Sequence, residues 1–274
     1  MNPRDEARAR HTTGTAFDKA AIDGRAALIG YLPAGYPSVQ GGIEAMRAMV
    51  DAGVDVVEVG LPYSDPLMDG PVIQTAVDAA LRDGTTTYDV LRTVEAVAAT
   101  GVPAVVMSYW NPIIRYGADR FARDLAAAGG AGAITPDLTP DAADAWLPPA
   151  REHGLDTVFL VAPSSTDERL ALTAHACRGF VYATSVMGVT GARTSIGTAA
   201  NTLVARTRKV TDLPIAVGLG VSTAEQASEV ASFADGVIVG SALVRLLIEA
   251  ATLTDGVRAV AELTRDLADG ARRG

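Results

Sequence analysis

Two carboxylates follow one another in the segment VEVGLPYSDPLMDGP, residues 57–71, in settings that suit acid/base chemistry. Glu58 lies in a β-branched run that predicts a strand, and Asp69 ends the Gly- and Pro-rich loop that follows this run. Two carboxyl groups in different surroundings can divide such work, because one exchanges protons while the other stabilises positive charge. The segment therefore predicts an active site.

The expected environment of Glu58 follows from the alternation of side chains along a strand. Val57 and Val59 share one face, which suits packing against helices, so Glu58 is expected on the opposite face. In a barrel this face points inward, and loss of hydration there raises the pKa of a carboxyl group towards neutrality. The structural alternative is an ion pair with a neighbouring strand. The expected strands carry no basic residue except Arg25 at the entrance of the first, so the pattern favours catalysis.

Asp69 has a weaker local signal than Glu58. Asp-Gly is a common turn pair, and Ser64-Asp65-Pro66, earlier in the same loop, is typical of an Asx turn or a helix entry. On local composition alone these residues are structural. The position of Asp69 after the strand that carries Glu58 favours a role beside it in the chemistry.

Two glycine-rich turns near the other end of the chain predict a phosphate site. VGLGVST, residues 217–223, and VGSA, residues 239–242, each follow an expected strand and precede an expected helix. Bare glycine backbone can approach an anion, a helix N-terminus offers free N–H groups, and the loops after strands seven and eight commonly bind phosphate in barrels. The alternative is that these glycines only tighten the turns. The expected phosphate contacts are Gly218, Gly220, Gly240 and Ser241.

A third segment, FVYATSVMGVTGAR at residues 180–193, joins an expected strand containing Tyr182 to a loop of small and flexible residues. In this loop Gly188 and Gly191 flank the pair Val189-Thr190. Such a composition suits a lid that closes over substrate and excludes water. A plain surface loop fits the composition equally well, so both interpretations stay open.

Short β-branched runs, which predict strands, alternate with alanine-rich segments, which predict helices. These elements would position the candidate site residues. The predicted strands are Ala26–Leu32, Val54–Gly60, Ala104–Ser108, Gly132–Thr135, Thr157–Val161, Phe180–Thr184, Pro214–Gly218 and Gly236–Val239. The predicted helices are Gly42–Ala52, Tyr88–Ala99, Asp119–Ala128, Asp141–His153, Ala199–Val210, Ala224–Ala231 and Gly256–Ala271. Alternation of this kind implies parallel pairing with right-handed crossovers.

Strand–helix units repeated over 274 residues favour a closed (β/α)8 TIM barrel of the phosphate-binding type, an α/β fold, over an open sheet. No Gly-x-Gly-x-x-Gly turn follows the first strand, which argues against a dinucleotide-binding fold. Neither a linker nor a shift in composition divides the chain. We expect one domain over residues 1–274, with residues 1–20 as a poorly defined N-terminal extension or helix.

Composition argues against several classes of function. The net charge is −9, so a general affinity for nucleic acid or an anionic membrane is not expected. No apolar stretch is long enough for a membrane span, and the N-terminus lacks the apolar segment of a signal peptide. The single cysteine, Cys177, suits a reducing cytoplasm. It lies two residues from His175 on an expected helix, where the side chains point apart, and no metal site is expected.

Segments in a fixed order make the chain similar to the tryptophan synthase α subunit family: EVGLPYSDPLMDGP, MSYWNP at residues 107–112, YATSVMGVTGAR, GLGVST and GSA. The resemblance extends from about Leu28 to the last expected helix. It implies retro-aldol cleavage of indole-3-glycerol phosphate to indole and glyceraldehyde 3-phosphate. It also implies that this chain needs neither a metal nor an organic cofactor.

The resemblance implies roles for individual residues. Glu58 matches the family's catalytic acid/base, and Asp69 matches the carboxylate that faces the indole N–H. Tyr182 matches a tyrosine close to the glycerol phosphate, and Thr190 matches a loop threonine that orients Asp69. Tyr31 replaces an aromatic residue, usually Phe, that lines the indole pocket. The other implied substrate contacts are Tyr109, Gly191, Gly220, Gly240 and Ser241.

Two positions depart from the common family pattern. Thr139 stands where Pro is frequent, and Tyr36 stands where Asp is common. Both lie outside the acid/base pair, so they bear on details of the pocket and not on the reaction.

The resemblance also implies a partner. Family members dock on a β subunit that holds pyridoxal phosphate and condenses indole with serine to tryptophan, in an αββα heterotetramer. Residues 61–63 and 110–114 are apolar candidates for this contact.

Other functions remain to be weighed. One is a stand-alone lyase that releases free indole. Another is a catalytically silent barrel that only activates a partner, although the presence of Glu58, Asp69 and Tyr182 together argues against it. An isomerase or epimerase of another sugar phosphate is disfavoured, because the His/Asp metal set of ribulose-phosphate-type enzymes is absent.

Overall fold

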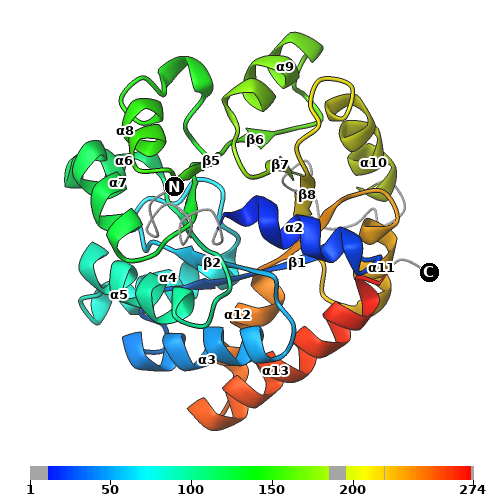
Figure 1. The fold of residues 1–274 in the computed structure, drawn as a ribbon. Helices are drawn as coiled ribbons and strands as arrows, with labels where there is room; N and C mark the ends of the chain where they lie inside the picture. Colours follow the sequence, from blue (N-terminus) through cyan, green and yellow to red (C-terminus); the bar gives the residue numbers. More distant parts are fainter. Residues whose placement is uncertain (1–11, 185–195, 219, 273–274) are drawn as a thin grey trace.

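Parallel strands pair side by side around a central barrel (Figure 1). The computed structural model describes residues 12–184, 196–218 and 220–272. The strands are β1 (Ala27–Pro33), β2 (Val56–Gly60), β3 (Ala104–Met107), β4 (Gly132–Ile134), β5 (Asp156–Val158), β6 (Leu160–Val161), β7 (Val181–Thr184), β8 (Ile215–Gly218) and β9 (Gly236–Val239). Their order in the sheet is β5-β4-β3-β2-β1-β9-β8-β7-β6.

The sheet closes on itself at one interrupted strand. β5 and β6 are separated by Phe159 alone, and together they match the single strand predicted over residues 157–161. β5 pairs with β4, whereas β6 pairs with β7. Both ends of the sheet order therefore belong to one stretch of chain, which makes the sheet a barrel. The predicted (β/α)8 barrel is confirmed, and each predicted strand is found.

Helices surround the barrel (Figure 1). They are α3 (Val39–Asp51), α4 (Pro71–Arg82), α5 (Thr87–Ala98), α6 (Trp110–Tyr116), α7 (Ala118–Ala127), α8 (Leu147–Glu152), α9 (Asp167–Ala176), α10 (Ile196–Thr207), α11 (Ala224–Ala231), α12 (Ser241–Glu249) and α13 (Leu253–Gly270), with a 3₁₀ turn η1 (Pro140–Ala142).

Two local predictions about helices were wrong. Residues 141–153 do not form one helix but η1 and α8. The cause is the pair Pro148-Pro149, which lacks the N–H groups that a helix interior requires and fits only a first turn. Cys177 does not share a helix with His175, because α9 ends one residue before it.

Two buried apolar layers lie on either side of the strands. Val57 and Val59 belong to the layer between the strands and the helices, whereas Val56 belongs to the layer inside the barrel. The period-two alternation predicted for β2 is therefore confirmed. It directs every second side chain of this strand into the barrel.

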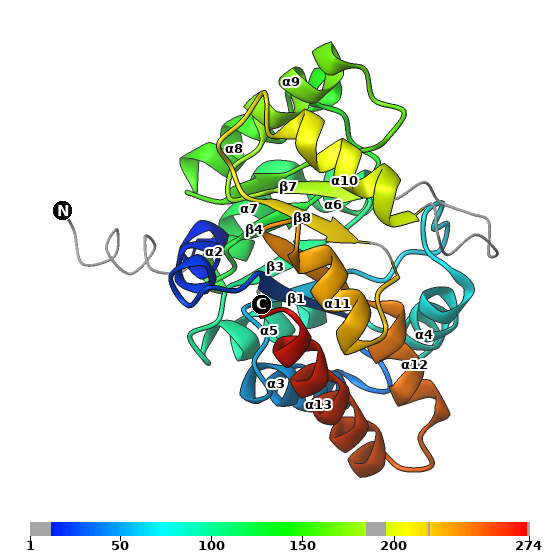
Figure 2. The same cartoon turned by 90° about the vertical axis from the view of Figure 1, so that its right-hand side faces the viewer.

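A helix that precedes the first strand, α2 (Thr13–Ile22), lies across one end of the barrel (Figures 1 and 2). Phe17 packs into the inner apolar layer, and its ring centroid lies 5.2 Å from that of Phe180. The N-terminal part is thus helical from Thr13 onward. Because α2 covers the amino ends of the strands, the carboxyl ends form the free mouth of the barrel.

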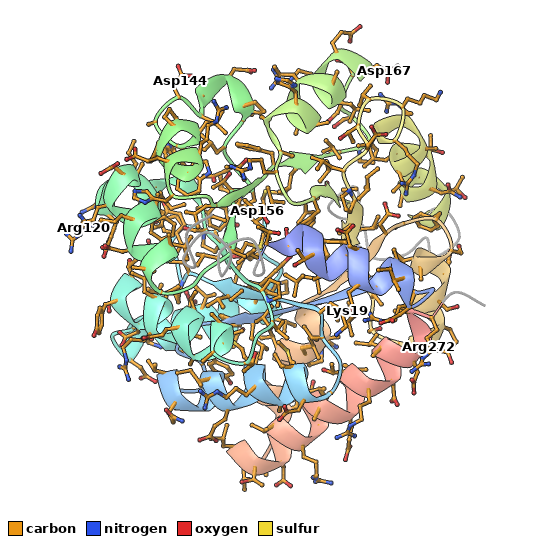
Figure 3. All side chains as sticks on the ribbon, viewed as in Figure 1. Lys19, Arg120, Asp144, Asp156, Asp167 and Arg272 are labelled. Carbon is orange, nitrogen blue, oxygen red and sulfur yellow. The ribbon has the colours of Figure 1, made fainter. Side chains whose placement is uncertain are left out.

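Asp156, at the start of β5, lies beside α2 and fixes its first turn (Figure 3). The Oδ2 atom accepts the N–H of Thr13 at 2.9 Å and the hydroxyl of Thr13 at 2.6 Å, across 143 residues of sequence. Thr12, the N-cap of α2, forms no capping bond with its own side chain. Asp156 therefore supplies the acceptor that the helix end requires.

We expect Asp156→Ala to lower the free energy of unfolding by about 1–3 kcal/mol, because the buried N–H of Thr13 loses its acceptor. Urea unfolding measures this change. Asp18→Ala, at an exposed position of α2, is the matched control and should shift the value by less than about 0.5 kcal/mol. Equal stability of the Asp156 variant and the wild type would show that β5 does not anchor α2.

Candidate active site

Glu58 lies inside the barrel near the carboxyl end of β2. The valines on either side of it pack outward, and Glu58 itself is 1% exposed. In the register between β1 and β2 it stands beside Tyr31. The ion-pair alternative is not realised, because no basic residue of the described ranges pairs with Glu58. Arg25 binds Asp55 instead, with 2.7 Å between Nη2 and Oδ1.

Burial gives the Glu58 carboxyl group an unusual protonation state. Loss of hydration raises its pKa from 4.5 to about 8, the direction that the sequence predicts. Among the described residues, Oε1 has no hydrogen-bond partner that would stabilise the charged form. The group is therefore mostly protonated at neutral pH, and it can give a proton to a bound molecule and take one back.

Asp69 lies between β2 and α4 and is half-buried at the same barrel mouth. Burial raises the pKa of its carboxyl group, and hydrogen bonding with the Tyr109 hydroxyl opposes this rise. The charges of both Asp69 and Glu58 act on the phenols of Tyr31 and Tyr182. The structure thus brings two carboxyl groups of different environment to one mouth, lined by tyrosines.

Tyr31 and Tyr182 rise from β1 and β7 into this mouth. Burial raises the pKa of both phenols well above the ordinary value, and the nearby carboxylates raise it further. Both phenols therefore stay protonated at neutral pH and can act as hydrogen-bond donors.

Glycines make room for these tyrosine side chains. A Cβ atom on Gly218 would lie 2.6 Å from the Tyr182 hydroxyl oxygen, and one on Gly60 would lie 2.5 Å from that of Tyr31. A Cβ atom on Gly240 would lie 3.2 Å from the Tyr31 ring. The approach of the rings therefore accounts for glycine at these positions, whether or not an anion also binds there.

The N-terminus of α12 keeps N–H groups available. Gly240 is its N-cap and offers no capping side chain, and the amides of Ser241 and Ala242 donate to no acceptor in the described chain. The N-terminus of α11 differs, because the side chains of Thr223 and Gln226 already bond to amides there. Anion binding at the two turns stays a prediction, and α12 offers two free amides for it.

The remaining predicted contacts are Gly220, Thr190 and Gly191. Gly220 is exposed with a φ of +68°, a left-handed conformation that glycine adopts without strain. Thr190 and Gly191 lie in residues 185–195, which are outside the described residues, as is most of the loop predicted as either a lid or a plain surface loop. Within the described ranges no three His, Cys, Asp or Glu side chains gather as a possible metal site. No helix of these ranges is long and apolar enough to cross a membrane.

One connection at the mouth was not predicted from the sequence. Asp137, in the loop after β4, accepts the N–H of Trp110 at the start of α6 at 2.8 Å. The preceding residue, Tyr109, uses its hydroxyl oxygen to accept the N–H of Met68 at 2.8 Å. The available signal was an acidic residue in the short loop after an expected strand, two residues beyond Thr135.

Known proteins similar to this chain agree with the geometry. The family model described as tryptophan synthase alpha chain matches residues 17–272. A tryptophan synthase alpha chain from Salinispora arenicola is 63% identical over 259 residues, covering 94% of this chain and 97% of the relative. One from Mycobacterium tuberculosis is 57% identical over 261 residues, covering 95% and 94%.

Solved structures extend the likeness to three dimensions. A structure of Mycobacterium tuberculosis tryptophan synthase superposes with a TM-score of 0.89 at 57% identity, covering 96% of this chain and 98% of that chain. Tryptophan synthase subunit alpha from Legionella pneumophila superposes with a TM-score of 0.86 at 33% identity, covering 94% and 97%. Both the sequence and the barrel therefore show that the chain belongs to the tryptophan synthase alpha chain family.

Proposed function

We propose that the chain cleaves indole-3-glycerol phosphate by a retro-aldol reaction to indole and D-glyceraldehyde 3-phosphate. The observation that carries this proposal is the pair of carboxyl groups at the barrel mouth. Glu58 is buried with a pKa of about 8, while Asp69 is half-buried and hydrogen-bonded. An acid that is protonated at neutral pH beside a second carboxylate is what this cleavage requires.

The reaction begins with proton transfer from Glu58 to carbon C3 of the indole ring. This transfer places positive charge on the ring nitrogen, and the Asp69 carboxylate stabilises that charge across the mouth. The Glu58 carboxylate then takes the proton of the hydroxyl on the adjacent glycerol carbon. As the aldehyde forms, the carbon–carbon bond breaks and its electrons return to the ring. Glu58 ends the cycle protonated, so protons and electrons balance within this chain.

The phosphate group of the substrate is proposed to bind at the start of α12. The free amides of Ser241 and Ala242 point outward from the helix end, where the helix dipole favours an anion. Gly220 adds open backbone from the loop after β8. This arrangement explains how a protein of net charge −9 could hold a phosphoester without a basic cluster.

Ser241→Asp is expected to raise KM for the phosphorylated substrate by about tenfold or more, because a second negative charge would face the phosphate. Steady-state kinetics of indole release measure this change, with kcat less affected. Ser228→Asp, an exposed position on α11, introduces the same charge on a helix surface and serves as the control. An unchanged KM in the Ser241 variant would place the phosphate elsewhere.

A β subunit that holds pyridoxal phosphate is the proposed partner, in an αββα assembly, and this chain itself is proposed to need no cofactor. A groove of about 580 Å³ is the proposed docking surface, and it is lined by residues 61–63 and by part of the second apolar segment, residues 111–112. Leu61, Pro62 and Pro112 line it. Nearby Ile114 is 51% exposed, whereas Ile113 is fully buried and cannot contribute to a contact.

Indole release from indole-3-glycerol phosphate, measured with the purified chain alone and then with its β subunit, tests the proposal. Weak turnover that the β subunit stimulates strongly is the expected result. Full turnover without the partner would indicate a stand-alone lyase instead. Absence of turnover in both assays would indicate a silent regulatory barrel and contradict the proposal. We place the reaction in the cytoplasm, where the lone Cys177 stays reduced.

A further inference from the structure

The loop that carries Asp69 is fastened to the strand and helix next to it. The N–H of Leu61 donates to the carbonyl of Met107 at 2.8 Å, where the loop leaves β2. Further along, the N–H of Met68 donates to the hydroxyl oxygen of Tyr109 at 2.8 Å. Met68 directly precedes Asp69, so the second bond fixes the backbone next to the carboxylate.

Tyr109 is well placed to act on Asp69 itself. Its side chain is only 6% exposed, and its ring packs 5.4 Å from that of Tyr63, measured between centroids. A phenol hydroxyl has one proton, and accepting the Met68 N–H leaves this proton free for donation. Hydrogen bonding between Tyr109 and Asp69 lowers the pKa of the Asp69 carboxyl group against the effect of burial.

Other charged or titratable groups do not replace this contact. Tyr31 and Tyr182 face Asp69 from β1 and β7 and feel its charge, as Tyr109 does. In the described part of the chain, neither Lys nor Arg forms an ion pair with Asp69. The backbone next to Tyr109 is held as well, because Asp137 accepts the N–H of the following residue, Trp110, at 2.8 Å.

We infer that Tyr109 is a positioning residue, whose hydroxyl accepts the Met68 N–H and donates to the Asp69 carboxylate so that this carboxylate meets the ring nitrogen of the substrate. The inference rests on the proposed function. It assigns Tyr109 a role through Asp69, beyond the substrate contact expected from the sequence. The hydrogen bond from Tyr109 orients the Asp69 carboxylate, which stays charged without it. Loss of this hydrogen bond should therefore affect kcat more than KM.

Tyr109→Phe tests the inference, because it keeps the buried ring and removes only the hydroxyl. We expect kcat for indole release to fall about tenfold, with KM changed less than about threefold. We also expect the pKa of Asp69 to rise, because a hydrogen bond to its charged form is lost. Titration of carboxyl carbon resonances in the full-length chain measures this pKa, and Asp69→Asn assigns the signal by its disappearance.

Tyr88→Phe is the matched control, since it also removes a phenol hydroxyl but at an exposed position on α5 that belongs to neither the active site nor the docking groove. It should change neither kcat nor the pKa of Asp69. The inference is overturned if Tyr109→Phe leaves either kcat or the pKa of Asp69 unchanged. A wild-type chain that releases no indole would refute the proposed function instead, and the titration alone would then decide whether Tyr109 holds Asp69.

Discussion

Glu58→Gln is expected to reduce kcat for indole release by about a thousandfold or more, while substrate binding changes less than about threefold. Glutamine has nearly the size and shape of the protonated carboxyl group, so it fills the same buried position. It cannot give a proton to indole C3 or take one from the glycerol hydroxyl. Turnover assays with ligand binding by calorimetry separate the two effects.

The wild-type chain should also show the signature of this group in its pH profile. Because free Glu58 must be protonated to begin the cycle, kcat/KM should fall as pH rises through about 8. Glu95→Gln, an exposed position on α5, provides a matched control with normal turnover and the same profile. Near-normal activity of Glu58→Gln would remove Glu58 from the mechanism.

The same substitution should stabilise the fold at alkaline pH. Unfolded Glu58 loses its proton near pH 4.5, whereas the folded protein retains it up to about pH 8. Between these values the folded state binds more protons than the unfolded state, so the free energy of unfolding falls as pH rises. Glutamine has no such ionisation. Glu58→Gln should therefore exceed the wild type by a few kcal/mol at pH 8.5 and differ little at pH 4.5.

Urea unfolding at these two pH values measures the difference in free energy of unfolding between the variant and the wild type. Glu95→Gln should have the same free energy of unfolding as the wild type at both pH values. Equal stability of Glu58→Gln and wild type at pH 8.5 would mean that ionising Glu58 costs the folded state nothing. A gain in stability together with a loss of turnover is the expected trade-off at a site where a charged group is buried for chemistry.

The position of Glu58 could be predicted because the period of a strand is two and the outer layer of a barrel is apolar. Val57 and Val59 point outward, so the residue between them had to face inward. Local patterns of this kind also located every strand, even the one interrupted at Phe159.

The helix that closes the barrel was harder to predict. The contact that anchors α2 joins Thr13 to Asp156 over 143 residues, and neither residue has a local pattern that points to the other. Likewise Asp137 and Trp110 meet only because β3 and β4 are neighbours in the barrel. Hydrogen bonds between distant loops depend on the final fold, so a single sequence does not reveal them.

The glycines of the mouth show a second limit. A missing Cβ atom is compatible with an anion contact, a tight turn or a bulky neighbour, and the sequence does not distinguish these causes. At Gly218 the structure reveals the neighbour, since the Tyr182 hydroxyl occupies the space that a Cβ atom would need. A prediction of phosphate contacts from glycine alone therefore needs a second observation, such as the free amides of α12.

Asp69→Asn is the second substitution with a large expected effect. We expect kcat to fall by about a hundredfold to a thousandfold, because the positive charge on the indole nitrogen loses its preorganised counter-charge. Asparagine keeps the size of the side chain, so the loop between β2 and α4 should retain its backbone bonds to Tyr109 and Met107. Asp65→Asn, an exposed position on the same loop, is the matched control and should stay within about threefold of the wild type.

A further readout separates loss of charge at Asp69 from damage to the mouth. The charge of Asp69 raises the pKa of the phenols of Tyr31 and Tyr182, so both values should fall in Asp69→Asn. Burial alone raises the pKa of Glu58, so the fall of kcat/KM near pH 8 should persist at the reduced rate. Retained turnover with lowered phenol pKa values would make Asp69 a turn residue whose charge the reaction does not use. Lost turnover, with kcat/KM still falling near pH 8, would instead indicate that the two carboxyl groups have separate roles: proton exchange at Glu58 and charge stabilisation at Asp69.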